Sequence, residues 1–71
     1  MDTRATDITI IHQQDKQHSR VYPKTMKGTL WMLNSMLMPA GDPPEYITVR
    51  TVLVADLMDH MIKDGLIVEI R

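Results

Sequence analysis

Hydrophobic residues recur at helical spacing along residues 51–65, and this is the clearest pattern in the chain. At about 100° per residue, the pattern divides a helical wheel into an apolar half and a polar half. The apolar half contains Leu53, Val54, Leu57, Met58, Met61 and Ile62, and the polar half contains Asp56, Asp59, His60 and Lys63. We predict an amphipathic helix with one buried face, near whose centre Leu57 is fully buried.

Signals at both ends delimit this predicted helix. Thr48 or Thr51 can serve as its N-cap, and Gly65 stands where a left-handed residue commonly follows a helix. Residues 66–70 then alternate with the two-residue period of a strand. The C-terminal part of the chain is therefore predicted to be a helix that passes directly into a strand.

The N-terminal part of the chain predicts a β-hairpin. Residues 7–12 form a β-branched run that is typical of a strand. Residues 19–22 can form a second strand that ends at Pro23, since proline cannot donate to a ladder. Residues 13–17 connect the two strands, and residues 1–6 are polar and expected to be frayed.

A second helical pattern covers residues 24–38. Its narrow apolar stripe consists of Met26, Leu30, Leu33 and Leu37, widened by Met32 and Met36. We predict that this stripe packs on the sheet. Thr25 can serve as the N-cap, and a later start near Thr29 stays open because Gly28 disfavours a helix interior. Pro39 ends the helix, because the residue before a proline is pushed out of the helical conformation.

Together these elements predict a single α+β domain over residues 1–71, in the order β-β-α-α-β. We expect strands 7–12 and 66–70 to pair in one small, mainly antiparallel sheet, with both helices packed on one face. Ile47 and Val49 alternate as well, which allows a short extended piece before the second helix. A chain of this size buries only roughly 60% of the surface that its unfolded form exposes, so association would add needed stability.

Composition narrows the class of protein. The chain has no cysteine, which excludes disulfides and thiolate metal sites and favours a reducing, cytoplasmic location. No apolar run approaches the roughly 20 residues that span a bilayer. The formal net charge of −1 argues against a general polyanion binder, but the charge is uneven. Residues 16–41 contain four bases and no acid, whereas residues 42–71 contain six acids and three bases.

Candidate chemistry is sparse. Asp56 and His60 are one helical turn apart and could share a metal or a proton, but two ligands do not make a site, and a solvated pair is the better interpretation. Ser19 and Ser35 lie in no nucleophile signature, and there is no glycine-rich phosphate loop. We therefore expect no catalytic residues, no metal and no cofactor, and predict that the protein is not an enzyme.

Two sets of residues are candidates for contact with a partner protein. Trp31 and Met38 project away from the apolar stripe of the first helix, in an arc that also carries Lys27 and Asn34. Exposed apolar patches mark binding sites, and tryptophan is enriched among interface hot spots. We predict a homodimer that buries Trp31 beside its two-fold axis. The acidic face with Asp56 and Asp59 is the second candidate contact.

The C-terminal third also resembles the closing half of a winged-helix domain, on the segments Thr48-Val-Arg-Thr51 and Met61-Ile-Lys-Asp-Gly-Leu-Ile67. The resemblance implies a nucleic-acid-binding regulator whose recognition helix is the second helix. Asp56 and Asp59 on that helix would repel phosphates. The residues left to approach DNA are Thr48, Arg50, Thr51 and Arg71.

The leading hypothesis is a non-enzymatic interaction module that binds and modulates or inhibits another protein, as compact chains from phages and mobile elements often do. The alternative is the winged-helix-like nucleic-acid-binding regulator. We expect a protein partner and a homodimer, and no membrane association.

Overall fold

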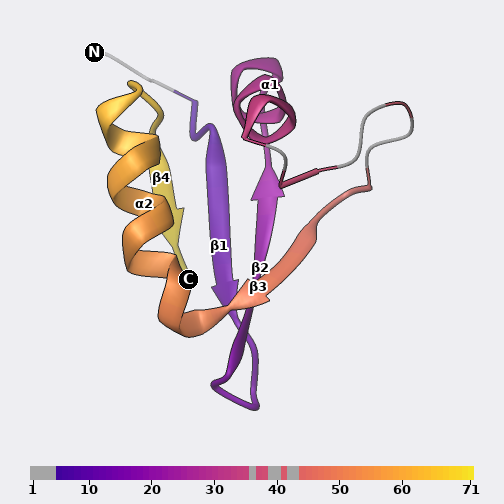
Figure 1. Cartoon of the computed structure of the whole chain (residues 1–71), viewed down its shortest axis with the longest axis vertical. Coiled ribbons are helices and arrows are strands. Elements are labelled where there is room, and N and C mark those ends of the chain that lie inside the picture. The colour runs from indigo at the N-terminus through magenta and orange to yellow at the C-terminus, as the bar shows by residue number, and fades with distance from the viewer. Residues whose placement is uncertain (1–4, 36, 39–40, 42–43) are drawn as a thin grey trace.

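The computed structural model describes residues 5–35, 37–38, 41 and 44–71 (Figure 1). In chain order its elements are β1 (Ile8–His12), β2 (His18–Pro23), α1 (Met26–Asn34), β3 (Ile47–Arg50), the short 3-10 helix η1 (Thr51–Leu53), α2 (Val54–Lys63) and β4 (Val68–Ile70). The α+β class and the predicted order of the main elements are confirmed. The expected fraying of residues 1–4 lies outside the described residues.

The four strands form one mixed sheet in the order β3-β2-β1-β4. β2 pairs antiparallel with both β1 and β3, whereas β4 lies parallel to β1. The predicted pairing of the first and last strands is therefore confirmed. The short extended piece at Ile47 and Val49 is a true edge strand, β3, so the sheet has one strand more than the main prediction.

The hydrophobic core lies between the helices and one face of the sheet. Ile8 and Ile10 of β1 point to this face, together with Val21, which lies opposite Ile10 on β2. Met32 from α1 and Met61 from α2 complete a fully buried set. Both helices thus cover the same face, as predicted. No described helix covers the opposite face.

Asp7 joins three distant segments just before β1. One carboxylate oxygen accepts from the Thr25 hydroxyl at 2.6 Å, and the other accepts from the Ile67 amide at 2.9 Å. These two hydrogen bonds, the Thr25 bond first, hold the pKa of Asp7 below its ordinary value. Thr25 also accepts from the Gly28 amide, so the predicted N-cap of α1 is confirmed. The start of α1 is therefore fixed to the start of β1.

The predicted orientation of α1 is correct only in part. Leu33 packs against the core and Met32 is buried, as predicted, but the first two residues of the stripe face solvent. Met26 is 73% exposed and Leu30 is 50% exposed, whereas Gly28 and Met32 face the core. The reason lies at Gly28, where a Cβ atom would overlap the carbonyl oxygen of Asp7. The helix backbone approaches the start of β1 closely there, which leaves Met26 and Leu30 facing solvent. The helix also ends at Asn34 and not at residue 38; Met36 and Pro39 lie outside the described residues.

The orientation of α2 agrees with its pattern only in part, because Leu53 and Ile62 of the predicted apolar half are 50% and 56% exposed. Val54 and Met61 are buried, and the polar half faces solvent. Leu57 is only partly buried, so its predicted full burial is wrong, because the centre of the inner face lies closer to Val54 and Met61. Gly65 has the expected positive φ of 86°.

The start of α2 differs from the prediction. Thr48 lies within β3 and Thr51 begins η1, and α2 has no side-chain hydrogen bond at its N-cap. The chain turns into α2 through the 3-10 helix, so neither threonine is placed to cap it. None of the described helices is long and apolar enough to cross a membrane.

Candidate functional site

The predicted contact surface around Trp31 is largely used within the chain. The indole Nε1 of Trp31 donates to a carboxylate oxygen of Asp64 at 2.6 Å, and its ring packs against the core. The Lys27 ammonium donates to the carbonyl oxygen of Gly65 at 2.9 Å. Both side chains therefore hold α1 against the C-terminal end of α2.

Met38 is only 3% exposed and belongs to the core, so its predicted place in the contact surface is wrong. The prediction extended helical geometry to residue 38, but α1 ends at Asn34. Beyond that point the positions of a helical wheel no longer apply. The Leu37 amide donates to the carbonyl oxygen of Met32, which turns the chain back toward the core.

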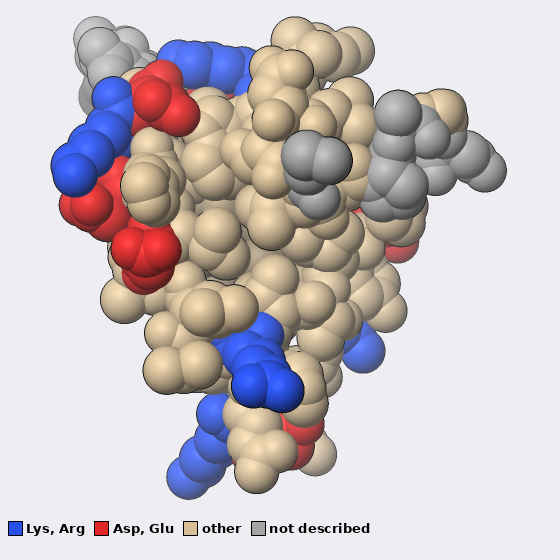
Figure 2. All heavy atoms as spheres, in the orientation of Figure 1, with Lys and Arg blue, Asp and Glu red and all other residues tan. Residues whose placement is uncertain are grey.

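An apolar surface is nevertheless present on α1, on the side that faces away from the sheet. We define the outer face of α1 as Met26, Leu30 and Asn34, which are spaced by four residues and all exposed. Figure 2 shows mainly uncharged atoms over α1, whereas acidic and basic side chains gather over α2. This contrast separates an apolar helix surface from a charged one.

The predicted acidic contact face of α2 is exposed. Asp59 pairs with Lys63 at 3.0 Å, and Asp56 lies 3.8 Å from the His60 ring nitrogen, each within the helix. Exposed pairs of this kind contribute little to stability. The described residues contain no group of three His, Asp or Glu side chains that could hold a metal ion. The face is thus a solvated surface that a partner can approach.

The residues of the nucleic-acid alternative divide into two places. Thr48, Arg50 and Thr51 follow one another at the end of β3, and the Thr51 hydroxyl bonds to that of Ser19 at 2.9 Å. Arg71 follows β4, at the opposite edge of the sheet, and its Nε donates to Glu69. Three of the four are therefore neighbours in the sequence, and the sheet separates Arg71 from them.

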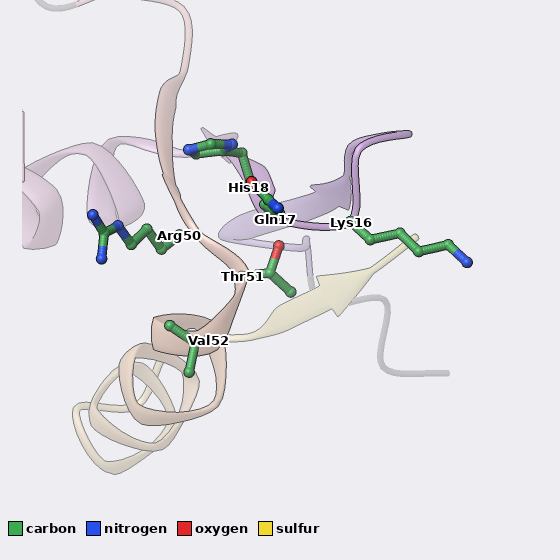
Figure 3. A pocket seen from close by; sticks show the side chains of 6 residues that line it. All are labelled: Lys16, Gln17, His18, Arg50, Thr51 and Val52. Carbon is green, nitrogen blue, oxygen red and sulfur yellow. The ribbon is translucent and has the colours of Figure 1, made fainter.

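An open pocket of about 440 Å³ lies beside this end of β3 (Figure 3). Its lining consists of Lys16, Gln17, His18, Arg50, Thr51 and Val52. In Figure 3 the Arg50 and Lys16 side chains point in opposite directions and do not converge on one point. The pocket therefore gives this end of the sheet a cationic surface, but its basic side chains are not arranged to hold one small ligand between them.

A cluster that the sequence analysis did not identify lies on the uncovered face of the sheet. The rings of Tyr22 and Tyr46 lie 5.0 Å apart between centroids. The Arg20 guanidinium lies 4.7 Å from the Tyr46 centroid, and the Lys24 ammonium lies 5.7 Å from that of Tyr22. We call these four residues the basic-aromatic strip. Cations at these distances interact favourably with aromatic rings.

Comparison of the chain with protein-family models, with curated proteins and with solved structures finds no match. The surfaces described above therefore carry the functional argument.

Proposed function

We propose that the chain is a non-enzymatic protein-interaction module, and that two copies associate through the outer face of α1. The observation that carries this proposal is the exposure of Leu30. Leu30 lies about 200° around the helix from the buried Met32. It is nevertheless apolar and half exposed, and it lies beside the still more exposed Met26. Contiguous exposed apolar side chains on a small domain are typical of a binding surface.

A second copy suits this surface because the surface is uncharged. Lys27 is the only ionisable residue of α1, and its ammonium is bonded to Gly65. Two outer faces related by a two-fold axis would therefore meet without repulsion between like charges. A two-fold interface joins identical patches, which places Leu30 of one copy near Leu30 of the other. Such a dimer would present the acidic residues Asp56 and Asp59 twice to a basic partner protein.

Sedimentation velocity tests the self-association. We expect the wild-type protein to sediment as a dimer at micromolar concentration and Leu30→Glu to sediment as a folded monomer. Ala55→Glu is the matched control, because it adds the same charge to an exposed position on α2. This control variant should remain a dimer. A wild-type protein that stays monomeric at several hundred micromolar would refute the proposed interface.

A further inference from the structure

A regular alternation runs through β2 and its flanks. Every second residue is basic or aromatic, in the series Lys16, His18, Arg20, Tyr22 and Lys24. Successive side chains of a strand point to opposite faces. Ser19 and Val21, which lie between these positions, are fully buried on the core side. The basic and aromatic side chains of β2 itself are therefore directed to the face that no described helix covers.

β3 extends this set across the sheet. Its register pairs Arg20 with Thr48 and His18 with Arg50, and Tyr46 follows the same series to reach Tyr22. The result is two neighbouring rings, with a guanidinium over one and an ammonium over the other. From His18 at the start of β2 to Lys24 just after its end, an extended chain covers about 20 Å, at about 3.3 Å per residue.

We infer that this face of the sheet binds single-stranded nucleic acid, with bases stacked on the basic-aromatic strip. Aromatic rings and guanidinium planes are general platforms for unpaired bases, because every base has a flat π-face. Lys24 at one end and the cationic pocket with Lys16 and Arg50 at the other would meet the phosphates. A duplex would fit less well, because its bases are already stacked on one another.

The distribution of charge supports an anionic ligand on this face in spite of the net charge of −1. Asp56 and Asp59 lie on the exposed side of α2, and α2 packs on the other face of the sheet. The carboxylate of Asp15 is engaged within its own turn, because it accepts from the backbone amides of Gln17 and His18 and lies 3.0 Å from the His18 ring nitrogen. Glu69 lies on the same face as Tyr22, because both are paired with Thr9 of β1, but it is two strands away on β4 and its carboxylate is bonded to Arg71.

Fluorescence anisotropy with labelled oligonucleotides tests the inference on the whole chain. The probes are a 12-nucleotide oligo(dT), a 12-nucleotide oligo(rU) and a mixed-sequence 12-base-pair DNA duplex. We expect both single strands to bind more tightly than the duplex. Contacts to about three phosphates would lower the affinity roughly 20-fold between about 50 and 200 mM salt.

Matched substitutions separate stacking from simple charge attraction. Tyr46→Ala and Tyr22→Ala should each weaken binding about tenfold, whereas Tyr46→Phe, which keeps the ring, should bind as the wild type does. Lys63→Ala removes a cation from α2, away from the strip, and should have no effect. Trp31 packs on the opposite side of the sheet, so its fluorescence during thermal unfolding reports whether each variant is folded.

Three results of the oligonucleotide measurements, and one competition result, would overturn the inference. The first three are no binding of either single strand at low salt, equal binding of the duplex, or unchanged binding by a folded Tyr22→Ala, Tyr46→Ala double variant. Poly-glutamate that displaces oligo(dT) at equal charge concentration would point to an acidic protein segment as the ligand and would equally overturn it. The Leu30→Glu variant should bind oligo(dT) normally, so this test does not depend on the proposed dimer.

Discussion

The two helices pack on the same face of the sheet but differ in the side chains that line their inner and outer sides. In α2 the buried side is formed by Val54 and Met61, and mainly acids and bases occupy the exposed side, together with Ile62. In α1 the inner side is formed by Gly28 and Met32, while Met26 and Leu30 face solvent. A helix that docks through close backbone contact needs few large side chains on its inner face. Met26 and Leu30 are then free for another contact.

The largest expected effect on stability is at the inner side of α1, and it is measured against a substitution on the outer side. Met32→Ala should lower the free energy of unfolding by about 2–5 kcal/mol, because it leaves a cavity in the core. Leu30→Ala should cost less than about 1 kcal/mol in the monomer, since that side chain is half exposed. Urea denaturation followed by Trp31 fluorescence measures both. Equal costs for the two variants would show that the orientation of α1 described above is incorrect.

The helices also differ at their first turns, because α1 is capped by Thr25 and tied to Asp7 whereas α2 has no side-chain cap. The pKa of Asp7 is lowered in the folded protein, so its contribution to stability is present above the ordinary carboxyl pKa of 3.8. That contribution is lost as the pH falls through the lower, folded value.

Asp7→Asn should therefore cost about 1.5–3 kcal/mol near pH 7, as expected for the loss of hydrogen bonds to a charged group. It should also reduce the loss of stability below about pH 4. Denaturation midpoints measured from pH 7 to pH 2 test both expectations. Wild-type and variant curves that remain parallel over this range would contradict the assigned role of the carboxylate.

A smaller effect is expected at the close approach of α1 to β1. Gly28→Ala places a Cβ against the carbonyl oxygen of Asp7, and overpacking of this kind typically costs about 1–3 kcal/mol. The better helix propensity of alanine offsets about 1 kcal/mol of that cost. The control is Ala55→Gly on the exposed side of α2, which should lose only the propensity. A stabilised Gly28→Ala variant would show that the backbones are not in close contact.

The smallest effect is expected on the outer side of α2. Replacing both Asp56 and Asp59 by asparagine should change the stability of the free domain by less than about 1 kcal/mol, because both carboxylates are exposed. Thermal unfolding of the double variant at low salt is sufficient to test this. A large loss would mean that the acidic side of α2 is part of the fold and not a free surface.

The difference between the helices also explains which parts of the fold could be predicted. In α2 the charged residues exclude one side from the core, so the local pattern is enough to orient the helix. α1 has a single charge and apolar residues around most of its circumference. Its orientation depends on the contact between Gly28 and Asp7, which are distant in the sequence, and on a helix end that falls before Met38. No local pattern carries that information.

The candidate surfaces were predictable to a similar, limited extent. Thr48 and Arg50 are among the residues that the sequence predicts to approach a nucleic acid, and they lie on β3. Arg20, Tyr22 and Tyr46 were missed, although the alternation from residue 16 to residue 24 was present in the sequence. Its meaning depends on which face of the sheet stays uncovered and on β3 pairing with β2. Both are features of the tertiary structure, which a local sequence pattern does not contain.

The position of β4 has a consequence for the synthesis of the chain. β4 is the parallel neighbour of β1, and the Ile67 amide reaches the Asp7 carboxylate across 60 positions of sequence. A growing polypeptide can therefore complete its sheet only after residue 70 has left the ribosome. Until then β1 has an unpaired edge and an incompletely covered Ile8 and Ile10. Non-local pairings of this kind form slowly. Until β4 has paired, the free edge of β1 can pair with other chains. The nascent protein is therefore most prone to aggregation in this interval.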